Sequence, residues 1–359
     1  MINRARFAIL DGESKYAKKT PPTARTRSFL WTLLFPAAAT VTTDVWFHTA
    51  PLSSNFSYGL ILAIINVSGA FLDGFFSAFE NGDAVPIGPK TEALHLVAEE
   101  VRTFGLSTYT SWAGMVNVAA SMGIARSNFA VGLLYILMCI GCGFVAHGLG
   151  SDFAQYVSPS DLLLDGTINA SYSPIPRANK IVDRTILVLT LYILTTYIFI
   201  ELTEPQQKFW AEESPSNQLV VSIFFAVGGA YTGNIVSKLA PENSQIPMGT
   251  ILCNATFSLL SLLLNRLQTY YRSPSESLVL KALSINFCGA ASIFSRHISG
   301  LSLLYTMSLK RSRLVFLNVS INLLFATMIY WIALVIESLP QHPGEGYSVI
   351  DSKADTQST

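Results

Sequence analysis

The chain has 359 residues, of which half are hydrophobic and only 13% are charged, and its 23 basic and 23 acidic side chains cancel. A soluble domain carries about 25% charged residues, so this composition predicts a membrane protein. Zero net charge argues against the broad basic surface with which proteins bind nucleic acids. The four cysteines all lie in apolar segments and are expected to be buried thiols, not a disulfide framework.

Nine apolar segments qualify as bilayer crossings, each of which needs about 20 mostly apolar residues. In chain order they cover residues 28–48, 58–79, 101–122, 128–149, 184–203, 217–239, 248–266, 280–303 and 314–336. The third and eighth segments are the weakest because they are rich in Ser, Thr and Gly. These segments predict an all-α integral membrane protein with nine transmembrane helices.

The distribution of Lys and Arg predicts how the chain crosses the membrane. The first 27 residues are polar and basic, which places the amino terminus in the cytoplasm. Alternation from there puts most of the remaining Lys and Arg on the same side and leaves the carboxyl terminus outside.

Two polar landmarks recur in the same order along the chain. Asn66 and Asn254 each lie within an apolar segment, and Tyr109 and Phe294 each stand among small hydroxyl side chains. The separation between the two asparagines nearly equals that between the two aromatic residues, which favours an inverted internal repeat. The expected organisation is a cytoplasmic tail at 1–27, a four-helix repeat at 28–149, a cytoplasmic linker at 150–183, an inverting helix at 184–203, a second four-helix repeat at 217–336 and an extracellular tail at 337–359.

The asparagines within the segments need an explanation, because an unpaired amide in hydrocarbon costs several kcal/mol. Hydrogen bonding between helices explains one isolated Asn as well as an anion path does. In the seventh segment, however, Thr250 lies one turn before Asn254 on the same helix face. This stacking of a hydroxyl and an amide favours a polar track.

The stretch "NFCGAASIFSRH", residues 286–297, indicates a helix interrupted within the membrane. Non-helical backbone at that depth is tolerated only where it is buried in protein or lines a cavity. Close helix packing around Gly289 is the alternative explanation. The positive edge of the Phe294 ring can lie against an anion. The other polar residues of the stretch that would face such a path are Ser292, Ser295, Arg296 and His297.

The patterns G-T-x-x-x-N at 249–254 and F-C-G-x-x-[ST]-x-F-S at 287–295 resemble the fluoride channels of the Fluc (CrcB) family. The layout of nine segments in two repeats resembles their fused eukaryotic form, the FEX fluoride exporters, over residues 28 to 336. The resemblance implies a broken third helix in each repeat and two narrow pores within one monomer, an internal pseudo-dimer. It also implies a passive, fluoride-selective channel of the plasma membrane that gives fluoride resistance, and not an enzyme.

The resemblance also assigns site residues. The family's pore asparagine matches Asn254 and, in the first repeat, Asn66. Its aromatic positions pair across the repeats, which puts Phe294 with Trp112 in one pore and Tyr109 with His297 in the other. The remaining pore-lining matches are Thr108, Thr110, Ser292, Ser295, Thr250 and Tyr135. Because only the first pair keeps two unambiguous rings, we predict one conducting and one degenerate pore.

A structural sodium ion is the one cofactor that the resemblance implies. In the family it lies between the halves on backbone carbonyl groups of the broken helices. The corresponding carbonyls belong to Gly105, Leu106, Gly289 and Ser292. Lys238 is the candidate for a positive charge in the cytoplasmic vestibule.

A coupled cation or drug antiporter of the small multidrug type is the main alternative. Such carriers need a Glu embedded in the first helix of each half, whereas the sixth segment has no acid and the first offers only Asp44. An intramembrane enzyme ranks third, because the spacing of Ser295 and His297 turns them to different helix faces. The chain has no P-loop and no G-x-G-x-x-G, so no nucleotide is expected as a partner, only fluoride and the lipid bilayer.

Overall fold

The computed structural model describes residues 22–49, 55–80, 92–125, 127–157, 190, 215–238, 247–268, 274–307 and 312–338. Every regular element in these ranges is a helix, and none of them contains a strand. The first group comprises α2 (Pro22–Thr49), α3 (Asn55–Glu80), α4 (Glu92–Glu100), the π-helical turn η2 (Val101–Leu106), α5 (Ser107–Tyr109), α6 (Trp112–Ala125) and α7 (Phe129–Val157). The second group comprises α10 (Pro215–Ser237), α11 (Met248–Gln268), α12 (Pro274–Ala282), η5 (Leu283–Phe287), α13 (Cys288–Ala291), α14 (Phe294–Met307) and α15 (Ser312–Ser338).

Six helical stretches of the described chain are long and apolar enough to cross a membrane, as expected of a multi-pass membrane protein. They are Tyr58–Glu80, Phe129–Val157, Gln218–Ser237, Met248–Gln268, Ser277–Tyr305 and Arg313–Ile336, and they match the second, fourth and sixth to ninth predicted segments. The first predicted segment lies within α2, and the third is divided among η2, α5 and α6. The predicted inverting helix at 184–203 lies outside the described residues except for Thr190.

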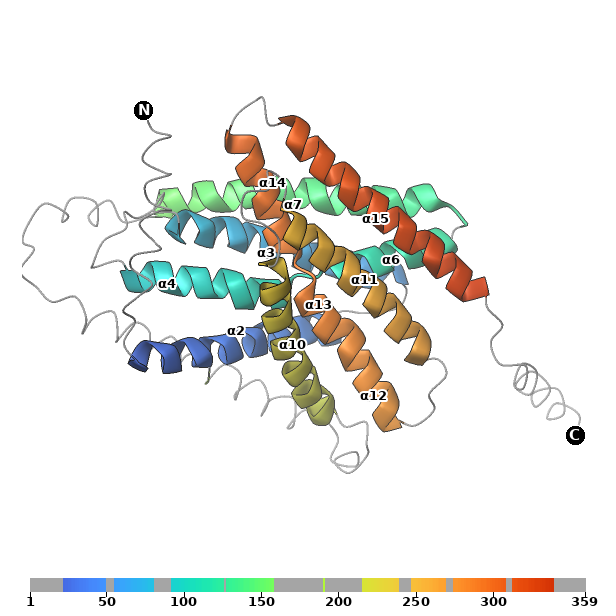
Figure 1. Ribbon diagram of the computed structural model, residues 1–359, viewed down its shortest axis with the longest axis horizontal. Coiled ribbons are helices and arrows are strands. Elements are labelled where there is room, and N and C mark those ends of the chain that lie inside the picture. Colours follow the sequence, from blue (N-terminus) through green and yellow to red (C-terminus); the bar gives the residue numbers. More distant parts are fainter. Residues whose placement is uncertain are drawn as a thin grey trace, which may run out of the picture.

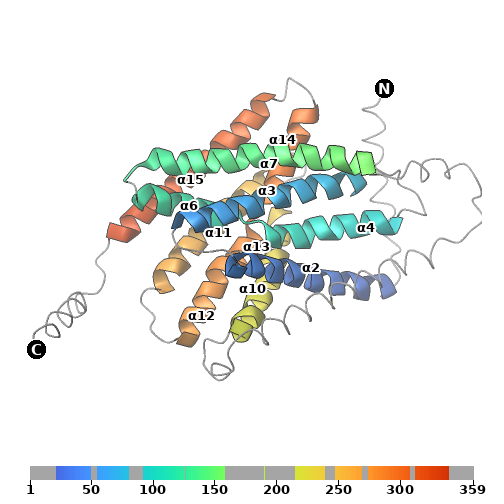
Figure 2. The same cartoon turned by 180° about the vertical axis from the view of Figure 1, so that it is seen from behind.

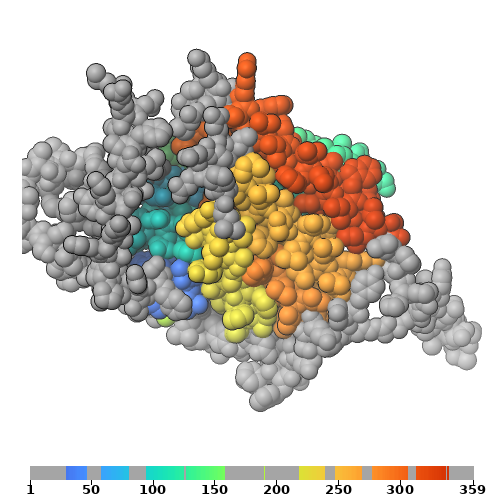
Figure 3. All heavy atoms as spheres, in the orientation of Figure 1, coloured from blue at the N-terminus to red at the C-terminus, as the bar shows by residue number. Residues whose placement is uncertain are grey.

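The two groups of helices cross each other. In Figures 1 and 2, α2, α3, α4 and α7 run side by side, and α10, α11, α12 and α15 run across them at a steep angle. Contacts between α2 and α10, between α6 and α11, and from α14 to α3 and α7 join the groups. The helices α10, α11, α12 and α15 form one continuous face in the space-filling view (Figure 3).

One apolar core joins the two groups. It contains Trp112 and Met115 from α6, Ile136 from α7, and Phe294 and Ile298 from α14, all of them buried. The outward faces of the long helices carry large apolar side chains instead, such as those of α7 and α15. Exposed apolar surface of this extent suits contact with lipid.

The closest helix contact is between α3 and α7. A Cβ atom placed on Gly74 would overlap the backbone oxygen of His147, and one on Gly150 would overlap that of Phe71. The two backbones therefore touch directly at two glycines, which is how small residues pack membrane helices.

The fourth predicted segment is longer than expected. The sequence prediction ended it at residue 149 and assigned the following residues to the linker, but α7 continues to Val157. The reason is packing: Ala154 is fully buried and lies in a cluster with Ala78 and Phe79 of α3 and Ala98 of α4. The rest of the predicted linker, residues 158–183, lies outside the described residues.

Two helices are broken near their midpoints. The first break follows α5 at Thr110, whose backbone is extended with φ −102° and ψ 146°. The second follows α13 at Ser292, with φ −94° and ψ 106°, three residues after the Gly289 at which the interruption was expected. A π-helical turn precedes each break, at Val101–Leu106 and at Leu283–Phe287.

Candidate functional site

The two broken helices cap each other where they cross. The first N–H groups of a helix have no partner within it, so a break in mid-chain creates unsatisfied donors. At the start of α6, Trp112 N donates to Ser292 O (3.2 Å) and Ala113 N to Ser292 Oγ (2.8 Å). At the start of α14, Ser295 N donates to Thr110 Oγ1 (3.2 Å). Three of the predicted hydroxyl residues therefore meet at this crossing.

The two predicted asparagines bind the breaks from neighbouring helices. Asn66 on α3 accepts a hydrogen bond from Ser111 N at 2.9 Å and donates one to Ser111 O at 3.2 Å. Asn254 on α11 accepts one from Ile293 N at 2.8 Å. Both asparagines are completely buried, but the Nδ2 atom of Asn254 has no partner in the described part of the chain. The two sites therefore differ, because Asn66 Nδ2 already donates one of its two N–H groups to Ser111 O, whereas neither N–H of Asn254 Nδ2 has a partner among the described residues.

Further buried polar atoms without partners lie on the helices around the second break. A polar group left unpaired away from water is costly, so such groups mark places where a polar ligand or water fits. Among the described residues they include Ser258 Oγ, Ser295 Oγ, both ring nitrogens of His297 and Asn318 Nδ2. The sequence prediction missed Ser258, although its position one turn after Asn254 and two turns after the buried Thr250 continues the same polar face.

Three predicted ring residues form one buried cluster. Trp112 stacks on Phe294 with ring centroids 6.2 Å apart and contacts the edge of the His297 ring at 4.8 Å. The expected neighbours Phe294 and Trp112 are therefore in contact. Among the described ring contacts His297 packs on Trp112, and the Tyr109 hydroxyl lies 3.1 Å from Ser68 Oγ, so Tyr109 and His297 make no ring contact with each other.

Other predicted residues bond to the backbone. The Tyr135 hydroxyl on α7 donates a hydrogen bond to Gly59 O on α3 at 2.8 Å, which links the two helices. Thr108 donates to Phe104 O of its own helix at 2.9 Å. These bonds indicate that both hydroxyls help to fix helices, although Thr108 also borders the cavity described below.

Three of the four carbonyls expected to hold sodium, those of Leu106, Gly289 and Ser292, already accept hydrogen bonds. Leu106 O accepts from the backbone N and the hydroxyl of Thr110, Gly289 O from Ser292 Oγ, and Ser292 O from Trp112 N. A carbonyl oxygen has two lone pairs, so Gly289 and Ser292 each keep one for a cation while Leu106 has none left over. Gly289 and Ser292 therefore fit the expected ligand set, and Leu106 does not.

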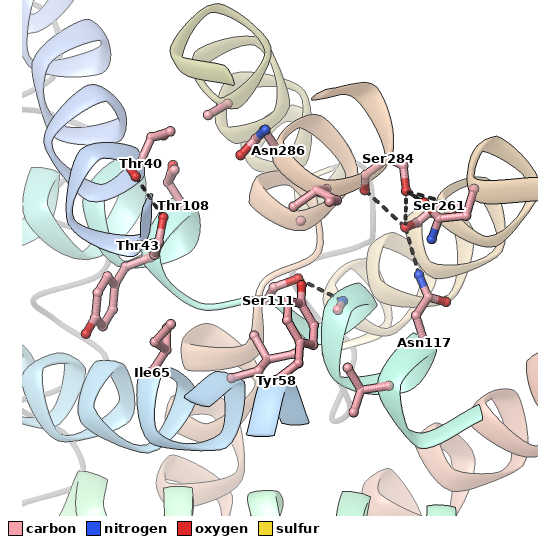
Figure 4. Close-up of a pocket in the computed structure, with 18 of the residues that line it drawn as sticks. Thr40, Thr43, Tyr58, Ile65, Thr108, Ser111, Asn117, Ser261, Ser284 and Asn286 are labelled. Atoms are coloured by element: carbon pink, nitrogen blue, oxygen red, sulfur yellow. Dashed lines mark hydrogen bonds between the residues drawn. The ribbon is translucent and has the colours of Figure 1, made fainter. Parts of the chain in front are cut away.

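A polar cavity of about 230 Å³ lies beside the crossing, bordered by α3, α6, α11 and η5 (Figure 4). It reaches the first break at Tyr109 and Ser111 and the second broken helix at Gly289. The side chains lining it are apolar or carry hydroxyl and amide groups, and none of those in the described chain is acidic or basic. The cavity is therefore uncharged, and its hydroxyl and amide groups share the lining with apolar side chains.

Hydrogen bonds order one wall of this cavity. Asn117 donates from Nδ2 to Ser261 Oγ (2.8 Å), Ser261 donates to Ser284 O (3.0 Å), and the Ser284 hydroxyl bonds to Asn265 (Figure 4). The sequence prediction missed this network. Its only signal was the spacing of Asn117 from Ser121 and of Ser261 from Asn265, which puts each pair on one helix face.

A charged cluster lies toward the other end of α3. Arg102 donates from Nε to Asp73 Oδ1 and from Nη2 to Ser299 Oγ, each at 3.0 Å, and it also pairs with Glu80. His147 on α7 places Nε2 3.4 Å from Asp73 Oδ2. Asp73 comes eight residues after Ile65, which lines the cavity, so the helix separates the two features by about 12 Å. The sequence analysis did not identify this pairing of Asp73 with Arg102.

Comparisons with protein-family models, curated proteins and solved structures found no match to this chain. The described residues define an all-helical protein of the multi-pass membrane type, in which two broken helices cross beside a neutral polar cavity.

Proposed function

We propose that this protein is a fluoride-selective passive channel that exports cytoplasmic fluoride across the plasma membrane and so gives fluoride resistance. The observation that carries the proposal is the crossing of two broken helices next to a neutral, hydroxyl- and amide-lined cavity. Non-helical backbone within a membrane-length helix is tolerated where it serves a cavity or an ion path.

The chemistry of the crossing suits a small anion. Fluoride is tightly hydrated, so a pore must replace its water with N–H and O–H donors and the positive edges of rings. Asn254 Nδ2 and the hydroxyls of Ser258 and Ser295 are buried donors without partners near the second break. Neutral donors also let the ion leave, which conduction requires. A negative-inside potential drives export with about 2.3 kcal/mol per charge per 100 mV.

The arrangement of elements supports the proposed inverted repeat. Both groups of helices run in the order helix, helix, broken helix, helix, and each carries an Asn on its second helix that bonds to its own break. With the segment at 184–203 as the inverting helix, the chain would cross nine times as a monomer with an internal pseudo-dimer. In the orientation predicted from Lys and Arg, the charged cluster is cytoplasmic and the cavity opens toward the outside.

One of the two pores would conduct, and we assign it to Phe294 and Trp112. Phe294 follows the second break and stacks on Trp112, and neither N–H of Asn254 Nδ2 has a partner among the described residues. Asn66 Nδ2 at the first break already donates one of its two N–H groups to Ser111 O. A sodium ion at the crossing would bind to Gly289 O and Ser292 O and hold the two broken helices together.

A coupled antiporter gains no support from the acidic residues. Residues 215–238, which contain α10, include neither Asp nor Glu. Asp73 and Glu80 of α3 both pair with Arg102. Neither carboxylate is therefore free to bind a transported cation.

Fluoride efflux from liposomes tests the proposal. Vesicles containing the purified full-length chain are loaded with potassium fluoride or potassium chloride, and a potassium ionophore sets the membrane potential. The channel should release fluoride as soon as the ionophore is added and release chloride no faster than protein-free vesicles. Equal release of both halides, or release only when a proton or drug gradient is imposed, would exclude a passive fluoride channel.

A further inference from the structure

Most hydroxyl groups around the cavity have used their hydrogens within the protein. A hydroxyl has one hydrogen to donate and two lone pairs with which to accept. Thr40 Oγ1 donates to Pro36 O at 2.8 Å, and Thr43 Oγ1 donates to Thr40 O at 2.9 Å. Thr108 Oγ1 donates to Phe104 O at 2.9 Å. These three threonines therefore offer a ligand in the cavity lone pairs and no hydrogen.

The opposite wall of the cavity shows the same pattern. Ser121 Oγ donates to Asn117 O and Ser261 Oγ to Ser284 O, each at 3.0 Å. The Ser284 hydroxyl bonds to Asn265. Figure 4 shows the threonines on one side of the cavity and the bonded serines on the other. Hydroxyl groups whose hydrogens are already committed therefore line the cavity on two sides.

This bonding decides which kind of ligand the cavity suits. Fluoride accepts hydrogen bonds and needs donors around it, so committed hydroxyls are poor partners for it. A cation would accept the lone pairs, but none of the lining side chains in the described chain is acidic, and a buried charge without a counter-charge is costly. An uncharged molecule that donates a hydrogen bond satisfies both conditions.

The apolar part of the lining indicates the rest of the ligand. Leu62 and Ile65 of α3, Met122 of α6 and Ile285 of η5 border the cavity. Apolar side chains favour contact with carbon over contact with water. The cavity measures about 230 Å³, whereas a water molecule takes about 30 Å³ in the liquid, so a molecule with several carbon atoms has room.

We infer that the cavity binds a small aliphatic alcohol, whose O–H donates to Thr43 or Thr108 and whose carbon chain lies against the apolar side chains. Both threonines are partly buried and therefore within reach of a ligand. Ser111 Oγ accepts from Gly114 N at 2.9 Å and keeps its own hydrogen for the alcohol oxygen. This site goes beyond the proposed function and is separate from the proposed conducting route, because its lining includes neither of the stacked rings of that route.

Photolabelling of the full-length chain in liposomes tests this inference. The probe is a short aliphatic alcohol that carries a diazirine group, and mass spectrometry locates its adducts. They should fall on cavity residues such as Tyr58, Tyr109 and Met122, and excess 1-butanol should reduce them. The isomer 1-methoxypropane has no O–H, so it should need about a fivefold higher concentration for half-maximal protection, the effect of one hydrogen bond.

Paired threonine variants test the assigned partners. Thr43→Val with Thr108→Val replaces two cavity hydroxyls by methyl groups of similar shape. Thr42→Val with Thr327→Val is the matched control: both threonines are partly buried and bond to a carbonyl of their own helix, but neither lines the cavity. The cavity pair should raise the 1-butanol concentration for half-maximal protection about fivefold, and the control pair should leave it unchanged.

Several outcomes would overturn the inference. Equal protection by 1-butanol and 1-methoxypropane on the wild type would show that no hydroxyl donor is recognised, whatever the stability of the variants. Adducts confined to the outward helix faces would indicate probe dissolved in lipid. Stronger protection by butylammonium would indicate a cation site, and protection by sodium fluoride would place the cavity on an anion route. Fluoride efflux from the same vesicles without alcohol decides the proposed function separately.

Discussion

The side-chain oxygen of Asn254 accepts a 2.8 Å hydrogen bond from the Ile293 N–H, at the point where α13 ends and α14 begins. Asn66 makes the same contact with Ser111 and adds a second bond to its carbonyl. Each broken helix is thus held by an amide on the neighbouring helix, because its first N–H groups have no partner of their own.

The unequal bonding of the two asparagines predicts unequal losses of stability. Asn66→Leu removes two hydrogen bonds to Ser111, whose carbonyl keeps Met115 N as a donor, whereas Asn254→Leu removes one bond to the Ile293 N–H. Each hydrogen bond contributes about 0.5–1.5 kcal/mol, so Asn66→Leu should lower the Tm in detergent further. Thr256→Val, at an exposed site on α11, is the control and should leave the Tm unchanged. Equal shifts for the two asparagine variants would contradict the assigned bonds.

The glycine contacts between α3 and α7 give a second prediction. Gly74→Ala and Gly150→Ala put a methyl group against the backbone of the facing helix, which cannot rotate away. Both variants should lower the Tm and the yield of folded protein. Gly141→Ala and Gly148→Ala, also on α7, meet nothing within 4 Å and should be neutral or slightly stabilising, because Ala favours helix more than Gly does. A similar loss in all four variants would mean that the helices do not touch at Gly74 and Gly150.

Much of this architecture was predictable from the sequence because membrane helices leave a strong local signal. Long apolar runs located six of the membrane-length helices, and the Ser- and Gly-rich stretch around Gly289 predicted a break within three residues of its position. The cost of burying an amide in hydrocarbon predicted that Asn66 and Asn254 are paired or face a polar path, but not that each bonds to a break.

The long-range side-chain contacts could not be predicted. Arg102 and Asp73 are 29 residues apart, and no local pattern connects them. The Asn117 and Ser261 pair spans 144 residues and depends on how α6 crosses α11. The end of α7 was predicted too early because residues 151–157 are polar enough to suggest a loop. In the structure the helix continues through these residues, and Ala154 packs on α3 and α4.

The ion pair between Asp73 and Arg102 predicts non-additive stability changes. Arg102→Gln leaves the buried carboxylate of Asp73 with His147 as its remaining direct partner, and removing one partner of a buried pair costs about 3–5 kcal/mol. Asp73→Asn should cost less, because Arg102 retains Glu80 and Ser299. The double variant should be more stable than the sum of the single losses predicts, as Tm measurements in a double-mutant cycle would show. Strict additivity would mean that the pair contributes no coupling energy.

The aromatic cluster supplies the prediction that separates the two pores. Phe294→Ile removes the ring that stacks on Trp112 beside the free donor of Asn254, so it should abolish fluoride efflux from liposomes. Tyr109→Ile acts at the first break, where the Asn66 amide is already bonded to Ser111, and should reduce efflux much less. Elution of both variants as folded protein in size-exclusion chromatography is the necessary control. The reverse ranking would place the conducting route along the cavity that Tyr109 lines, and equal losses would contradict the existence of one degenerate pore.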